Sequence, residues 1–266
     1  MEVGNCYLRL HHGRSLGLRL HRLPPDSFDN LICIFTDMKD IFTPDMRLSD
    51  MIDMNYTLMQ VMSRMGVGLS NAGLKADEAC RQCGLDISTF MLICNVYSFP
   101  DYVPSSKDIE SLCIPDIVRY LRGSHTYYTG RALNNLESSF DRLLEPCDET
   151  RKGAILKFFV EYKSELEKHF AREENEVFPY IEALQKGSRP EGYSRDQFEE
   201  HHESVDEKLE DMKNIVMKYL PEECDPELKM WVLISIYGLR DDLRRHTYVE
   251  DNVLVPAVRN LERDGE

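Results

Sequence analysis

The second half of the chain carries apolar residues at helical spacing, without the strict alternation typical of half-buried strands. From Pro115 onward, apolar positions recur every three or four residues, and the pattern breaks around Glu145–Thr150, Lys186–Tyr193 and Pro221–Pro226. These breaks predict four helices of roughly 30 residues, whose short connections favour antiparallel neighbours. We therefore expect an all-α fold, with an up-down antiparallel four-helix bundle over residues 110–262.

Helix start signals agree with these breaks. Asp225 precedes Pro226 and Glu227, which is typical of an N-cap followed by proline at the first helical position. Ser194 and Gln197 have the spacing of a capping box before the third helix.

The first hundred residues divide differently. Residues 46–98 predict short helices, because Leu58, Val61 and Met65 have helical spacing and glycines follow them. We expect a small helical domain over residues 38–100. Residues 1–37 are rich in Gly, Arg and His, and they predict a poorly ordered extension, with Met38 as an alternative start.

Composition narrows the possible partners and compartment. A formal net charge of −15 disfavours nucleic acid and anionic membrane surfaces as partners. The chain has no apolar run long enough to span a bilayer, and its first residues lack the apolar core of a signal peptide. Eight cysteines without an export signal favour free thiols in a reducing cytoplasm. The sequence also leaves open whether two chains pair through their N-terminal helices to form a homodimer.

Each predicted bundle helix places one histidine on its apolar face, and two of the helices add a glutamate one turn later. The face of the fourth helix contains Leu228, Val232, Ser235, Leu239, Leu243, His246, Glu250 and Val253. The ionisable side chains that face inward are His125, His169, Glu173, His202, His246 and Glu250. Burying them without partners costs several kcal/mol per charge, and no Lys or Arg lies on these faces to neutralise them. A bound cation would neutralise the buried carboxylates.

The positions of these residues along the helix axes are consistent with a single shared site. At ~1.5 Å per residue, His125 and His202 lie roughly 12–15 Å from the starts of their helices. The His169/Glu173 and His246/Glu250 pairs lie roughly 20 Å from the ends of theirs. Antiparallel packing therefore brings all six to one level. Imidazoles with carboxylates favour iron, with manganese second, and two carboxylates suit two bridged metals. Ferritin-like bundles use Glu-x-x-His with four carboxylates and fit less well.

These motifs resemble the hemerythrin-like HHE domains. The matching segments are His169-Phe-Ala-Arg-Glu173 with Val177-Phe178-Pro179, His246-Thr-Tyr-Val-Glu250 with Val253-Leu254-Val255-Pro256, Glu200-His-His202-Glu203, and Ser124-His125. Four histidines, two glutamates and a small leading domain are similar to the iron–sulfur cluster repair di-iron family. The resemblance implies two non-haem iron ions with an oxo or hydroxo bridge. It also implies a role in nitrosative and oxidative stress, with damaged iron–sulfur proteins as partners.

The leading domain departs from that family at one point. Met59–Gly68 and Ala79–Leu85 are similar to it, but its adjacent cysteine pair is missing, and the nearest thiols are Cys80, Cys83 and Cys94. We interpret these three as incidental thiols, although Cys80-x-x-Cys83 could also bind metal or cycle redox states.

Three nearby side chains have alternative interpretations. His201 lies about 100° from the apolar face and is the alternative to His202 as a ligand. Tyr128 and Tyr248 neighbour the ligands. Ordinary packing is the favoured role for both, and hydrogen bonding to a bound oxygen species is the alternative.

Three function classes remain open at this point. The first is repair of, or iron supply to, damaged iron–sulfur clusters. The second is binding or sensing of O2 or NO without turnover, and the third is an enzyme that reduces NO or peroxide. The sequence has no evident output domain for a sensor, and it does not reveal an electron donor for an enzyme.

Overall fold

The computed structural model describes residues 42–188 and 203–264, and all regular elements within those ranges are helical. The one β-type contact there is an isolated bridge between Arg47 and Lys75. The all-α prediction is confirmed for this part of the chain. The expected extension over residues 1–37 and the expected capping box at Ser194 lie outside the described residues.

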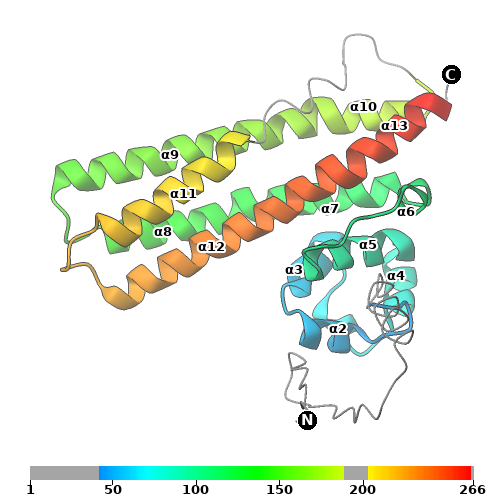
Figure 1. The fold of residues 1–266 in the computed structure, drawn as a ribbon, viewed down its shortest axis with the longest axis horizontal. Helices are drawn as coiled ribbons and strands as arrows, with labels where there is room; N and C mark the ends of the chain where they lie inside the picture. The colour runs from blue at the N-terminus through cyan, green and yellow to red at the C-terminus, as the bar shows by residue number, and fades with distance from the viewer. Residues whose placement is uncertain (1–41, 189–202, 265–266) are drawn as a thin grey trace, which may run out of the picture. The chain divides into compact units, whose positions relative to one another are not determined.

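Four helical rods form the bundle (Figure 1). In chain order they are α7 (Ile114–Tyr127), η2 (Tyr128–Ala132) and α8 (Leu133–Leu143); α9 (Glu149–Arg172), η3 (Glu173–Val177) and α10 (Phe178–Gln185); α11 (Glu203–Lys218); and α12 (Pro226–Val249), η5 (Glu250–Leu254) and α13 (Val255–Asp264). Contacts join α8 to α9, α9 to α11, α11 to α12 and α12 to α8. This closed ring of neighbours is the predicted up-down bundle.

Local capping explains where the rods begin. The Asp225 side chain accepts hydrogen bonds from the backbone N–H groups of Glu227 and Leu228, with Pro226 in the first turn as predicted. Asp148 caps α9 in the same way, through the backbone N–H of Arg151 at 2.9 Å. These caps satisfy amide groups that the first turn of a helix leaves without partners.

Shorter helices precede the bundle. They are α2 (Leu48–Met54), α3 (Leu58–Met65), η1 (Leu69–Asn71), α4 (Ala76–Cys83), α5 (Ile87–Ser98) and α6 (Ser106–Glu110). α3 packs on α7 and α5 packs on α12, and a single apolar core runs from Met65 to Leu121 and Phe178. Residues Phe42–Glu266 accordingly form one compact unit. The domain boundary expected near residue 100 stays a prediction.

One position on the predicted face of the fourth helix is wrong. Ser235 is exposed, and the neighbouring Ile236 is buried in its place between Val232 and Leu239. A period of 3.6 residues allows a step of three or four at each turn. Here the step of four brings the apolar side chain inward.

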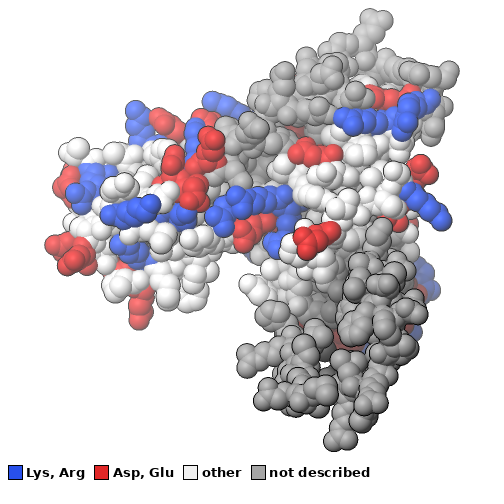
Figure 2. Space-filling view, in the orientation of Figure 1, with Lys and Arg blue, Asp and Glu red and all other residues white. Residues whose placement is uncertain are grey.

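Charged side chains of both signs are interspersed over the bundle on the face drawn in Figure 2. Ion pairs also join neighbouring rods, for example Lys163 of α9 with Glu137 of α8 at 2.6 Å. Within the described ranges, no helix combines the length and apolarity needed to cross a membrane.

Candidate metal centre

Four predicted ligands from three rods meet in the core. His125 of α7, Glu173 of η3, His246 of α12 and Glu250 of η5 each offer an atom within 4.8 Å of the others. All four are buried, with exposed fractions of 4% or less. His169 lies beside them, with Nε2 3.2 Å from Oε1 of Glu173. The structure thus brings five of the six predicted residues together. His202 and its alternative His201 lie outside the described residues.

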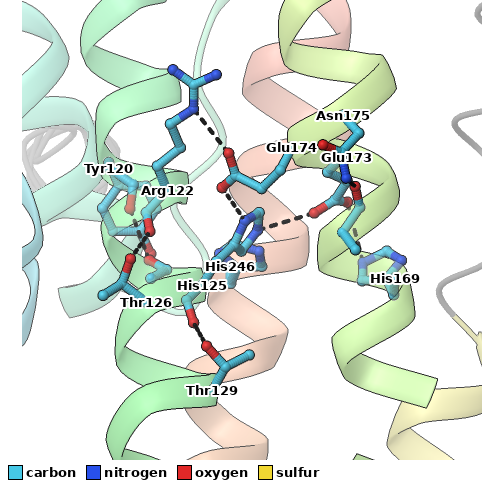
Figure 3. A network of polar contacts seen from close by, with 12 residues as sticks. Tyr120, Arg122, His125, Thr126, Thr129, His169, Glu173, Glu174, Asn175 and His246 are labelled. Carbon is cyan, nitrogen blue, oxygen red and sulfur yellow. Dashed lines mark hydrogen bonds and ion pairs between the residues drawn. The ribbon is translucent and has the colours of Figure 1, made fainter. Parts of the chain in front are cut away.

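The Glu173 carboxylate faces two imidazoles from different rods (Figure 3). Its Oε2 lies 3.0 Å from Nε2 of His125, and its Oε1 lies 3.2 Å from Nε2 of His169. On the fourth rod, Nε2 of His246 lies 2.9 Å from Oε1 of Glu250. Each oxygen of the Glu173 carboxylate thus faces a different imidazole, and the two imidazoles come from different rods.

These atoms converge without forming hydrogen bonds. Nε2 of His125, both ring nitrogens of His246 and both carboxylate oxygens of Glu173 are buried and have no hydrogen-bond partner among the described residues. Leaving such atoms unsatisfied is costly, and native interiors rarely do so. A cation shared by their lone pairs satisfies them, so the residues present fit a metal site.

Comparison with known proteins agrees with this donor set. Residues 116–258, more than half of the chain, match the Hemerythrin HHE cation binding domain. The chain belongs to this family. It is also similar to the iron-sulfur cluster repair protein ScdA of Staphylococcus haemolyticus, with 20% identity over 204 residues, which cover 73% of this chain and 89% of that protein. Because that alignment is longer than the HHE match, it includes residues outside the HHE segment.

A chain of polar contacts holds His125 in place at the HHE site (Figure 3). Nδ1 of His125 lies 2.8 Å from Oε1 of Glu174, and Nε of Arg122 donates to Oε2 of the same carboxylate at 3.0 Å. Arg122 also pairs with Glu182 at 3.1 Å. The Glu174 contact occupies Nδ1 and leaves Nε2 to face the centre, as is usual for histidine ligands. The sequence pattern did not indicate Glu174, because it lies off the apolar face.

The two buried HHE histidines have opposite pKa shifts. Burial lowers the pKa of His125, but the adjacent carboxylates of Glu173 and Glu174 more than offset this and raise it to about 9. Burial and the nearby His125 hold the pKa of His246 well below its usual value. In the metal-free protein His125 is therefore protonated at neutral pH, and His246 is neutral.

Metal binding is therefore expected to release a proton from His125. Below pH 6.5 this histidine stabilises the metal-free fold fully, and the contribution disappears as pH rises through about 9. The metal competes with the proton, so affinity for ferrous iron should rise by up to about tenfold per pH unit between pH 7 and 8.5. Anaerobic chelator competition measures this slope. An affinity that does not change with pH would exclude a protonated His125 in the metal-free site. In the Glu174→Gln variant, the affinity should depend less on pH than in the wild type.

The positions of the ligands coincide with π-helical turns. η3 begins at Glu173, η5 begins at Glu250, and η2 begins three residues after His125. A π turn inserts one extra residue, and such turns are rare and frequently lie at functional sites. The sequence analysis assumed straight α-helices and did not predict them.

Tyr128 and Tyr248 differ in their surroundings. The Tyr248 hydroxyl donates to the backbone oxygen of Tyr102 at 2.9 Å, so its hydroxyl has a structural partner. Tyr128 is buried edge-on against His246, with ring centroids 5.5 Å apart, and its hydroxyl has no hydrogen-bond partner among the described residues. Donation by Tyr128 to a bound oxygen species stays a prediction.

A buried ion pair lies one turn before His246. Arg64 of α3 contacts Asp242 of α12 through both carboxylate oxygens, with Nη1 2.8 Å from Oδ1. The Tyr97 hydroxyl donates to the same Oδ1 at 2.7 Å and lies 2.5 Å from the Tyr120 hydroxyl. This network ties the N-terminal helices to a rod that carries two ligands. Sequence periodicity carries no signal for such a long-range pair.

The thiols of the N-terminal helices are poorly disposed to reaction. Burial raises the pKa of Cys80 to about 12 and that of Cys94 well above its usual value. Neither forms a disulfide, and Cys83 is likewise a free thiol. Because the thiolate is the reactive form, these two buried cysteines are weak nucleophiles.

Proposed function

We propose that this HHE protein holds two non-haem iron ions and serves the repair of iron–sulfur clusters damaged by nitrosative or oxidative stress. The observation that carries the proposal is the Glu173 carboxylate, which faces His125 with one oxygen and His169 with the other. The proposed ligands are His125, His169, Glu173, His202, His246 and Glu250. The ScdA relative, named as an iron–sulfur cluster repair protein, supports the role in repair.

The roles of the residues follow from their positions. Glu173 and Glu250 would hold the ions through their carboxylates, and the histidines would hold them through ring nitrogens. Glu174 and Arg122 would fix the ring of His125, as partners of ligands do in other metal sites. When bound, ferrous ions in such a site supply an exchangeable source of iron and an attachment point for NO, O2 or peroxide.

Aromatic side chains packed around His125 also support the proposed function. Phe170 and Phe178 stack on the His125 ring, with centroid distances of 4.3 and 5.7 Å. These rings stack against the imidazole of His125, which is buried and shielded from water. Exclusion of water would keep a bound ion from hydrolysis until an acceptor protein or a small ligand reaches it.

Restoration of a damaged client enzyme tests the repair role. Iron-loaded protein is incubated anaerobically with an enzyme whose [4Fe–4S] cluster has been damaged by NO, and client activity is followed. We expect recovery several-fold faster than with an equal amount of free ferrous iron, and none with Glu250→Gln. Recovery no faster than with free iron would exclude repair. Steady consumption of NO with a reductant, without recovery, would favour the reducing enzyme instead, and reversible ligand binding alone would favour a sensor.

A further inference from the structure

Two buried cysteines touch at the end of the bundle that is remote from the metal centre. The Sγ atoms of Cys147 and Cys224 lie 3.9 Å apart, with exposed fractions of 8% and 3%. Cys147 lies between α8 and α9, and Cys224 lies between α11 and α12; Figure 1 shows both connections at the same end. At ~1.5 Å per residue, the start of α12 is roughly 30 Å from His246. The pair is therefore separate from the ligand cluster.

We propose that Cys147 and Cys224 are a site of reversible disulfide formation that staples the bundle when peroxide-class oxidants are present. Among the described cysteines, this is the pair whose sulfur atoms are in contact. A disulfide requires about 2.05 Å between sulfurs, so the atoms must approach by roughly 2 Å, which side-chain rotation can supply.

The backbone around both cysteines permits that approach. The Cys147 N–H donates to the Leu144 oxygen at 3.0 Å, and the Cys224 N–H donates to the Pro221 oxygen at 3.3 Å. Both residues thus belong to tight turns between rods. Small shifts of the backbone in these turns would not break hydrogen bonds within a helix. A pair on helix interiors would have to distort two rods to make the same bond.

The chemistry is balanced with peroxide as the oxidant. The more exposed Cys147 attacks as its thiolate and takes one oxygen from peroxide, which gives a sulfenic acid and hydroxide. The Cys224 sulfur then attacks that sulfur and displaces the oxygen as water. Overall, two thiols and one peroxide give one disulfide and two waters. The two electrons pass from the sulfurs to the peroxide oxygens.

The bond would join the two halves of the bundle covalently. The hairpin of the first two rods carries His125, His169 and Glu173, and the hairpin of the last two carries His246 and Glu250. A cross-link over this loop restricts the unfolded chain and stabilises the fold. The inference does not depend on which metal the centre holds.

The test uses the full-length protein as purified, treated with hydrogen peroxide or, in a second arm, with diamide, which oxidises thiols without iron chemistry. We expect a peptide containing Cys147 linked to one containing Cys224 and a mass loss of about 2 Da. The melting temperature should rise by roughly 5–10 °C and return with dithiothreitol. Cys83→Ser, a half-exposed control, should keep both effects, and Cys224→Ser should lose both.

Two results would overturn the proposal. One is that Cys147 and Cys224 stay reduced under conditions that oxidise Cys83 in the same molecules. The other is that the bond forms but leaves the melting temperature of the wild-type protein unchanged. Both readings come from the wild-type chain, so a poorly folded variant does not affect them. If diamide forms the disulfide but the protein contains no iron, the proposed function is contradicted and the disulfide proposal still holds.

Discussion

Loading the protein with iron is expected to raise its melting temperature by roughly 10 °C. In the metal-free state, the carboxylate of Glu173 and the ring nitrogens of His246 are buried without hydrogen bonds, which destabilises the fold. Bound ions would satisfy these atoms and connect the rods that carry them. Anaerobic differential scanning fluorimetry, with and without ferrous iron, measures the shift.

A pair of isosteric variants makes this prediction specific. Glu250→Gln keeps the volume of the side chain but removes the charge of a fully buried ligand, so the shift should fall to a few degrees or less. Glu207→Gln makes the same change at an exposed position of α11 and should keep the full shift. Equal melting temperatures for the loaded and metal-free wild-type protein would count against the site.

Replacing Arg64 with methionine is expected to cost about 3–5 kcal/mol of unfolding free energy. The change leaves Asp242 buried and charged without its cation, while the volume of the side chain is nearly kept. Urea unfolding at neutral pH measures the loss. Because Asp242 lies one turn before His246, the variant should also release iron to a chelator several-fold faster than the wild type.

A second arginine on the N-terminal helices provides the matched control. Arg81 pairs with Asp77 across one turn of α4, but its side chain is 72% exposed. Arg81→Met should therefore cost about 0.5 kcal/mol or less and leave iron release unchanged. Similar losses for the two variants would mean that the Arg64–Asp242 pair contributes no more than a surface pair. The double variant Arg64→Met with Asp242→Asn should recover part of the stability, because it removes both charges.

The sequence predicted the bundle well because its signals are local and periodic. Apolar spacing, the Asp225 N-cap and the His-x-x-x-Glu pairs each depend on residues within a few turns, and these predictions agree with the described structure. The inward positions of His125 and His246 could be predicted because a ligand on an apolar face departs from the polar-outside rule.

The features that could not be predicted depend on tertiary contacts. Glu174 lies next to Glu173 on a charged face, and its role becomes visible only when the first rod brings His125 within 2.8 Å. Arg64 and Asp242 are 178 residues apart in the chain, and neither lies in a motif. The π turns at Glu173 and Glu250 arise from packing and have no residue signature of their own.

Metal content together with the visible spectrum of anaerobically purified protein tests the central claim most directly. Wild-type protein should contain close to two iron ions per chain and, after oxidation, absorb in the near-ultraviolet and visible as a bridged ferric pair does. His169→Ala and Glu250→Ala should lose both iron and absorption while keeping their helical content. Wild-type protein that takes up no iron, or variants that bind as much iron as the wild type with the same spectrum, would contradict a di-iron centre at these residues.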